Sequence, residues 1–199
     1  MTLHIVHFIG PINHSSACAV RNLCLQALQS GASEIELHMS TEGGNMTAGF
    51  ALYFFLKSLP IPLTTFNIGS VESVGVVIFL AGQKRYACPG ARFLVHPLHW
   101  GFGSLVAADH ARVSEWRDCL DFDAERYAAI FDEATRGAPE AVDIRPPTSS
   151  ATRASIRPSR PCARASSTKP SRPACPPWAP RRIGGTEHTC AKLATVTVL

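Results

Sequence analysis

Residues 34–53 read EIELHMSTEGGNMTAGFALY and predict a strand, a tight turn and a helix in direct succession. Polar and apolar side chains alternate from Glu34 to Met39, which is the period of a half-buried strand. The turn Ser40–Asn45 contains Gly43-Gly44, where the absence of Cβ atoms permits a close approach to the backbone. An apolar helix follows from Met46 to about Ser58. The stretch is therefore one strand-turn-helix unit of an α/β fold.

The same kind of unit recurs on both sides of this stretch. Gly31 ends the first predicted helix, which Ser15 or Ser16 can cap. Strands that alternate with helices favour right-handed crossovers around a largely parallel sheet. The further elements predicted by periodicity are a strand at Leu3–Ile9, a helix to about Ser30, a strand at Leu63–Ile68, a turn at Gly69–Gly75, an apolar helix to about Leu80, a strand at Phe93–Val95 and one long or broken helix within residues 105–135.

The composition changes abruptly after Asp143. Residues 1–144 hold 9 Lys+Arg and 14 Asp+Glu, whereas residues 145–199 hold 10 Lys+Arg and 1 Asp+Glu, together with nine prolines. Such a segment buries too little apolar surface to offset its ordering entropy, so we predict a disordered tail. We divide the chain into a domain at residues 1–143 and a basic tail at 144–199. The tail is either a product of a shifted reading frame, which we favour, a functional basic tail that binds acidic partners, or an inert extension.

Several classes of protein do not fit the sequence. Apolar runs such as Val74–Gly82 are too short to span a bilayer, and no signal-peptide pattern opens the chain, so we expect a soluble protein of the reducing cytoplasm. None of the seven cysteines forms a C-x-x-C pair, so we expect buried thiols and chance cysteines in the tail, with no metal and no cofactor. The tail holds only Trp178 for base stacking, which argues against nucleic acid as a partner.

Two residues in the first domain are candidates for nucleophilic catalysis. Ser73 begins an apolar helix, where a serine is most often a helix cap. His96 ends an apolar strand and has a rival in His99, and a histidine at a strand end is often incidental. Gly43-Gly44 is by default interpreted as a structural turn. Spacing alone leaves all of these interpretations open.

Four sequence blocks in the same order resemble the proteolytic subunit of the Clp protease. Residues 35–53 resemble that family's strand, N-S-P-G-G turn and T-A-G-x-x-x-Y helix. The other three blocks resemble its G-x-A-A-S-M-G, A-G and hydrophobic-H-Q-P motifs, and they lie at Gly69–Gly75, Ala81-Gly82 and Phe93–Pro97. The resemblance runs from about residue 3 to 135, and it implies a spiral of ββα units like that of the Clp protease and crotonase superfamily.

The resemblance also implies a reaction and its residues. Ser73 would be the nucleophile and His96 the general base in peptide-bond hydrolysis through an acyl-enzyme. The backbone N–H groups of Gly44 and Val74 would stabilise the oxyanion. Asp143, 47 residues after His96, is the candidate for the third member of the triad. The implied partners are polypeptide substrates, further copies of the chain in heptameric rings, and an AAA+ unfoldase.

The sequence departs from the family pattern beside the candidate residues. Glu42 replaces the proline of the first turn, and Glu72 replaces the small residue before the nucleophile. Pro97 follows His96 directly, where the family has a glutamine. A carboxylate at Glu72 would oppose oxyanion formation if it pointed inward and would be harmless if it faced solvent. The carboxylates of the long helix are interpreted as solvated residues rather than triad members: Asp121, Asp123 and Asp132.

Two other functions remain open at this point. One is an inactive or truncated scaffold subunit, which would have the same fold and would not be acylated. The other is an acyl-CoA enzyme of the crotonase type, whose related fold also uses backbone oxyanion donors. The presence of Ser73 and His96 at the family spacing argues against the second.

Overall fold

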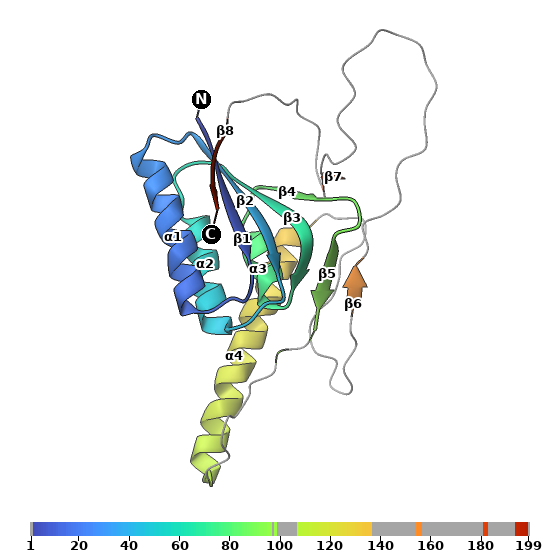
Figure 1. The fold of residues 1–199 in the computed structure, drawn as a ribbon. Coiled ribbons are helices and arrows are strands. Elements are labelled where there is room, and N and C mark those ends of the chain that lie inside the picture. Colours follow the sequence, from blue (N-terminus) through green and yellow to red (C-terminus); the bar gives the residue numbers. More distant parts are fainter. Residues whose placement is uncertain are drawn as a thin grey trace, which may run out of the picture. The chain divides into compact units, whose positions relative to one another are not determined.

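The computed structural model describes residues 2–96, 98 and 107–136, together with three short strands between residues 154 and 198 (Figure 1). The chain divides into two units, one of Met1–Phe93 with Ser155–Leu199 and one of Leu94–Ala154. The predicted boundary between residues 143 and 144 lies outside the described residues, as does most of the predicted disordered tail. None of the helices in the described part combines the length and apolarity that a membrane span requires.

The first unit is a parallel sheet with helices between its strands. The strand β2 pairs in parallel with β1 and with β3, and β3 pairs in parallel with β4. The predicted α/β fold with a largely parallel sheet is therefore confirmed. The elements are β1 (Leu3–Ile9), α1 (His14–Gln29), β2 (Glu34–Thr41), α2 (Met46–Lys57), β3 (Leu63–Glu72), α3 (Val74–Leu80), β4 (Lys84–Ala87) and β5 (Arg92–Val95), of which Arg92 and Phe93 belong to this unit.

Three short strands come from the C-terminal third, where the sequence pattern predicts none. They are β6 (Ala154–Ile156), β7 (Arg181–Arg182) and β8 (Ala194–Val198). The strand β8 pairs in parallel with β1, and β7 pairs antiparallel with β4.

The core of the first unit includes one face of β2 and both faces of the first half of β3. Ile35, Leu37 and Met39 alternate along β2 with half-buried polar residues and are fully buried. Figure 1 shows α1 and α2 side by side along the sheet, and α2 also packs on α3. The helix α3 is buried from Val74 to Phe79, which explains why its sequence is apolar on all sides.

Two strands are longer than the sequence pattern predicts by two residues or more, and β4 was missed in addition to the three strands of the C-terminal third. Ser40 and Thr41 belong to β2, and β3 continues to Glu72 through residues that were predicted as a turn. The pairing of β2 with β3 shifts register between Met39 and Thr41, and side chains replace ladder bonds there. The Ser40 hydroxyl accepts from the Ser70 N–H at 3.2 Å. The strand β4 has only four residues and no alternation, so periodicity did not reveal it.

The first helix begins differently from its prediction. Asn13, and neither Ser15 nor Ser16, is the N-cap of α1. The Asn13 side chain accepts from the Ser16 N–H at 2.9 Å, and the Ser16 hydroxyl accepts from the Asn13 N–H at 3.0 Å. This reciprocal pair is a capping box, in which Ser16 is the third helical residue rather than the cap. Gly31 has a φ of 75° just after the helix, as predicted.

The described part of the second unit is mainly the helix α4 (His110–Thr135), which is unbroken. Asp109 caps it by accepting from the Arg112 N–H at 2.8 Å. Asp121 and Asp132 are exposed as predicted, but Asp123 is buried, so its interpretation as a solvated residue was wrong. The charge of Asp123 is compensated by Arg126, whose guanidinium lies 2.5 Å away one turn along the same helix.

Candidate active site

Ser73 forms a one-residue connection between β3 and α3. Its φ of 54° and ψ of −131° make it the only non-glycine residue with a positive φ among the described residues. An L-residue adopts such a conformation at a cost of about 1–3 kcal/mol, and only where the surrounding structure enforces it. Ser73 occupies the N-cap position, but its side chain makes no capping hydrogen bond. The hydroxyl is therefore not explained by a structural role at the helix end.

The residues on both sides of Ser73 fix this strained turn. Val71 and Val74 are both 0% exposed, so the end of β3 and the start of α3 are anchored in the core. Glycines allow this packing, since a Cβ on Gly49 would lie 2.3 Å from Val74 Cγ2 and one on Gly75 would lie 2.4 Å from Thr41 Cγ2. The burial of two anchors one or two residues from the serine offsets the strain at Ser73.

The predicted Gly43-Gly44 turn lies directly against Ser73. A Cβ on Gly43 would lie 2.6 Å from Ser73 Cβ and 3.3 Å from its Oγ. Gly43 and Gly44 have φ values of 91° and 144°, which favour glycine at both positions. The structure thus brings together the turn and the serine that the sequence singled out separately.

A second connection supports the glycine turn from the other side. The Ile12 N–H donates to Gly43 O at 2.8 Å, and Ile12 O accepts from the Asn45 N–H at 2.8 Å. The Gly44 N–H lies between these two bonds and is left out of the pairing. The N–H of Val74 is in the first turn of α3 and has no acceptor within the helix. Each of the two segments that meet at Ser73 therefore has a backbone N–H that takes no part in the bridge to Ile12 or in the hydrogen bonds within α3.

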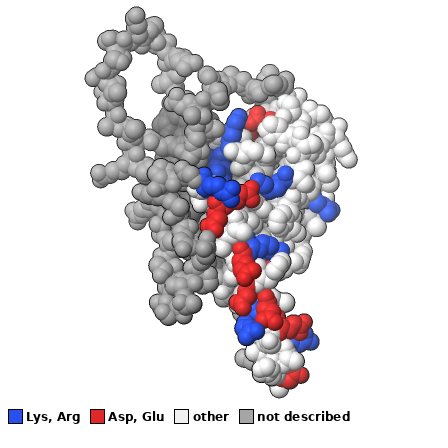
Figure 2. Space-filling model, turned by 180° about the vertical axis from the view of Figure 1, so that it is seen from behind, with Lys and Arg blue, Asp and Glu red and all other residues white. Residues whose placement is uncertain are grey.

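The carboxylate of Glu72, next to Ser73, is paired with Arg92. The Arg92 guanidinium binds a Glu72 oxygen through one terminal nitrogen and donates from Nε to Ser70 Oγ at 2.9 Å. The Glu72 side chain is only 15% exposed, whereas that of Arg92 is 62% exposed. Figure 2 shows basic and acidic side chains next to one another at several places on one face of the molecule. Sequence reasoning raised the question of Glu72 but missed Arg92, which lies 20 residues away.

The predicted base belongs to a different unit from Ser73, and the predicted third triad member lies outside the described residues. His96 is half-buried and follows β5 directly, in the second unit. His99 and Asp143 lie outside the described residues. The roles of His96 and Asp143 therefore stay predictions.

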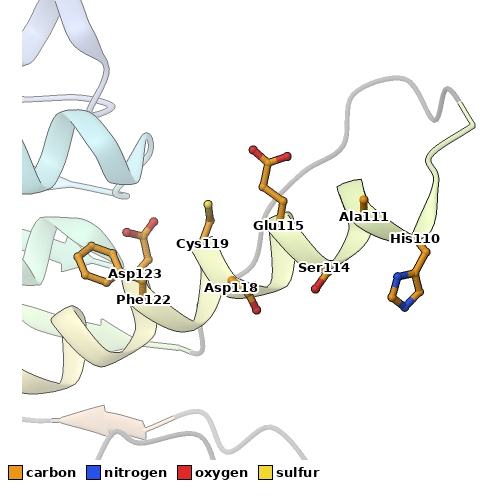
Figure 3. A pocket seen from close by; sticks show the side chains of 8 residues that line it. All are labelled: His110, Ala111, Ser114, Glu115, Asp118, Cys119, Phe122 and Asp123. Carbon is orange, nitrogen blue, oxygen red and sulfur yellow. The ribbon is translucent and has the colours of Figure 1, made fainter.

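The described residues contain a cavity elsewhere, along α4. It has a volume of about 880 Å³, and Figure 3 shows its side chains pointing to different sides of the helix rather than converging. No predicted site residue lines it. The lining residues all belong to α4: His110, Ala111, Ser114, Glu115, Asp118, Cys119, Phe122 and Asp123.

The four described cysteines are free thiols. Within the described residues no three His, Cys, Asp or Glu side chains are grouped to hold a metal ion. Cys24 is buried as predicted, and burial raises the pKa of its thiol to about 12, which keeps it protonated. The prediction of buried thiols was wrong for Cys18 and Cys119, which are exposed because they lie on the outer sides of α1 and α4.

These features define a class of protein, an α/β protein of parallel strand-turn-helix units with a strained, half-buried serine turn against a glycine turn. The family model described as Clp protease matches residues 2–116. The chain belongs to the Clp protease family.

Curated relatives support the same assignment. The ATP-dependent Clp protease proteolytic subunit 1 of Leifsonia xyli is 39% identical over 87 residues, which are 43% of this chain and 44% of the relative. The proteolytic subunit 2 of Corynebacterium efficiens is 33% identical over 125 residues, 57% of this chain and 62% of the relative. The chain thus spans between 44% and 62% of the length of these relatives.

A solved structure has the same fold. A mutant of ClpP1 from Listeria monocytogenes superposes with a TM-score of 0.59 at 22% identity, covering 66% of this chain and 71% of that one. At this identity the likeness concerns the fold alone.

Proposed function

We propose that this chain is a serine endopeptidase subunit of the Clp type, which hydrolyses peptide bonds through an acyl-enzyme. The observation that carries the proposal is the strained backbone of Ser73, with φ 54° and ψ −131°. A serine at a sharp strand-to-helix turn presents its Oγ away from the sheet, as nucleophiles of several hydrolases do. The Ser73 side chain makes no hydrogen bond that caps α3, so helix capping does not account for a serine at this position.

Each further role is assigned to a named group. Ser73 Oγ attacks the scissile carbonyl carbon, and His96 takes the hydroxyl proton and later delivers it to the leaving amine. The N–H groups of Gly44 and Val74 donate to the oxyanion, and Asp143 orients the histidine. Water then releases the acyl group from Ser73 Oγ. This chemistry requires no metal or cofactor.

The assembly and location are part of the same proposal. The relatives described above are named ATP-dependent proteolytic subunits. We propose that this chain likewise forms heptameric rings, receives unfolded polypeptide from an AAA+ unfoldase and works in the cytoplasm. Light scattering after size-exclusion chromatography measures the assembly, and a monomer at micromolar concentration would contradict the ring.

The activity is tested by labelling the full chain with a fluorophosphonate and measuring its intact mass. An activated Ser73 forms one bond from Oγ to phosphorus and releases fluoride, which adds one phosphonyl group per chain. Ser73→Ala should remain unlabelled. Ser15→Ala is the matched control, because Ser15 is exposed on α1 and its hydroxyl lies far along the chain from the candidate turn.

Two further substitutions test the triad. His96→Ala should abolish labelling within the assay time. Asp143→Asn should slow labelling, since loss of the orienting carboxylate costs about 10⁴-fold in a serine protease. Asp121→Asn, on the exposed side of α4, is its control. A folded wild-type chain that takes up no label would favour the alternative of an inactive scaffold subunit.

A further inference from the structure

Four polar groups link the end of β3 to the start of β5, beside the proposed nucleophile. Arg92 is the first residue of β5, and its side chain binds both Glu72 and Ser70 of β3. Its carbonyl oxygen accepts from the side chain of Asn67 at 2.8 Å. Asn67 is 0% exposed and also accepts from the Gly69 N–H at 3.0 Å. Arg92 is thus held at both its backbone and its guanidinium.

The position of Glu72 makes its charge important. Glu72 precedes Ser73 directly, and its side chain is mostly removed from solvent. A carboxylate in such a place is weakly screened by water and would repel the negative charge that develops on the oxyanion. Arg92 supplies the compensating positive charge at hydrogen-bond distance.

We propose that Arg92 is a positioning residue of the proposed hydrolytic reaction: it neutralises Glu72 and fixes that carboxylate beside Ser73. The inference rests on the proposed function. It explains how a chain with a glutamate next to its nucleophile keeps the electrostatic environment that oxyanion formation requires. Arg92 acts through Glu72 and does not touch the reacting atoms.

The contact needs an arginine rather than any cation. Nε and a terminal nitrogen of one planar guanidinium bind Ser70 Oγ and the Glu72 carboxylate at the same time. A lysine at position 92 would keep the charge but would offer one ammonium in place of this fork. Arg92→Lys should therefore restore only part of what Arg92→Ala removes.

The experiment measures the second-order rate of fluorophosphonate labelling for the wild type, Arg92→Ala, Arg92→Lys, Glu72→Gln and the double variant Arg92→Ala/Glu72→Gln. We expect Arg92→Ala to lower the rate about tenfold, as one uncompensated charge near the reaction would. The double variant should return to within about threefold of the wild type, because the unpaired carboxylate is gone. Glu72→Gln alone should be as fast as the wild type or faster.

The salt dependence of the labelling rate distinguishes an effect of the Glu72 charge from a displacement of the strand that carries Arg92. Raising NaCl from roughly 0.05 M to roughly 1 M screens the free carboxylate, so the deficit of Arg92→Ala should shrink at least threefold. A displaced strand would leave that deficit unchanged. Circular dichroism checks folding, and if Arg92→Ala does not fold, Arg92→Gln replaces it, because its amide keeps a donor for Ser70.

The outcomes are distinguishable. A wild-type chain that is not labelled at Ser73 overturns the proposed function and this inference with it. If the wild type is labelled and Arg92→Ala is labelled at the same rate, only the proposed role of Arg92 is overturned. A deficit that Glu72→Gln does not relieve, or that salt does not reduce, also overturns the role, because the effect would then not arise from the Glu72 charge.

Discussion

Replacing Gly43 by alanine places a methyl group where Ser73 already lies. The new Cβ would come within 2.6 Å of Ser73 Cβ and 2.9 Å of Glu72 O. Real Cβ atoms do not approach other atoms this closely, so one of the two segments must move. Both contacts are at the end of β3, where Val71 and Val74 hold the chain in the core. The substitution should therefore displace the glycine turn and the serine relative to each other.

The expected loss of unfolding free energy in Gly43→Ala has two parts, which a control variant can separate. The φ of 91° at Gly43 costs alanine about 1–2 kcal/mol of unfolding free energy. The steric conflict adds about 1–3 kcal/mol, as overpacking of a rigid site does. Gly90 has a similar φ of 84° but nothing within 4 Å of its virtual Cβ. Gly90→Ala should therefore lose only the free energy that its positive φ costs, without the steric contribution.

Urea denaturation gives the unfolding free energies, and fluorophosphonate labelling gives the reactivity of Ser73. We expect Gly43→Ala to be less stable than Gly90→Ala by about 1–3 kcal/mol. We also expect its labelling to be slower by at least tenfold, whereas Gly90→Ala labels as fast as the wild type. Equal destabilisation and equal labelling of the two variants would refute the argument that Gly43 is required by its contact with Ser73.

Three further substitutions test other parts of the structure. Ser73→Gly should be about 1 kcal/mol more stable than Ser73→Ala in urea, because glycine adopts the positive φ without strain; equal stabilities would contradict the strained turn. Asn67→Ala should lower the unfolding free energy by about 1–3 kcal/mol, because the part-buried Arg92 carbonyl and Gly69 N–H lose their partner; a loss below about 0.5 kcal/mol would contradict this. Partial burial and the nearby His38 lower the pKa of His7 below its ordinary 6.5. The unfolded chain therefore takes up the proton first, and the unfolding free energy should fall as the pH decreases below 6.5. Chemical denaturation between pH 5 and 8 measures this fall, and His7→Phe should reduce it.

The order of strands and helices in the first unit could be predicted because each element carries its own periodicity. Leu3–Ile9 matched its strand at both ends, since Gly10 and Pro11 stop it sharply. The C-terminal part of β3 could not be predicted in this way. Gly69 and Ser70 look like turn residues, and they remain in the strand because Asn67 and Ser40, which are far apart in the sequence, supply the missing hydrogen bonds.

The candidate site, too, could be predicted from the sequence only in part. The sequence blocks located Ser73 and the glycine turn, which lie next to one another in the structure. The sign of φ at Ser73 depends on the packing of Val71 and Val74, which no local pattern encodes. The pairing of Glu72 with Arg92 joins two strands 20 residues apart, so it too required the fold. A search for a cation able to compensate an unexpected glutamate would have been the only signal for it.

The bridge between Ile12 and the glycine turn has a consequence for hydrogen exchange. The amide hydrogens of Ile12 and Asn45 are both bonded across this bridge, although neither residue lies in one of the strands β1 or β2. They should exchange slowly, while the amide hydrogen of Gly44 between them exchanges fast. A bound anion or acyl group would slow Gly44 alone, whereas opening of the turn would accelerate Ile12 and Asn45 together. Three neighbouring amides thus report occupancy and local unfolding separately, without any label on the protein.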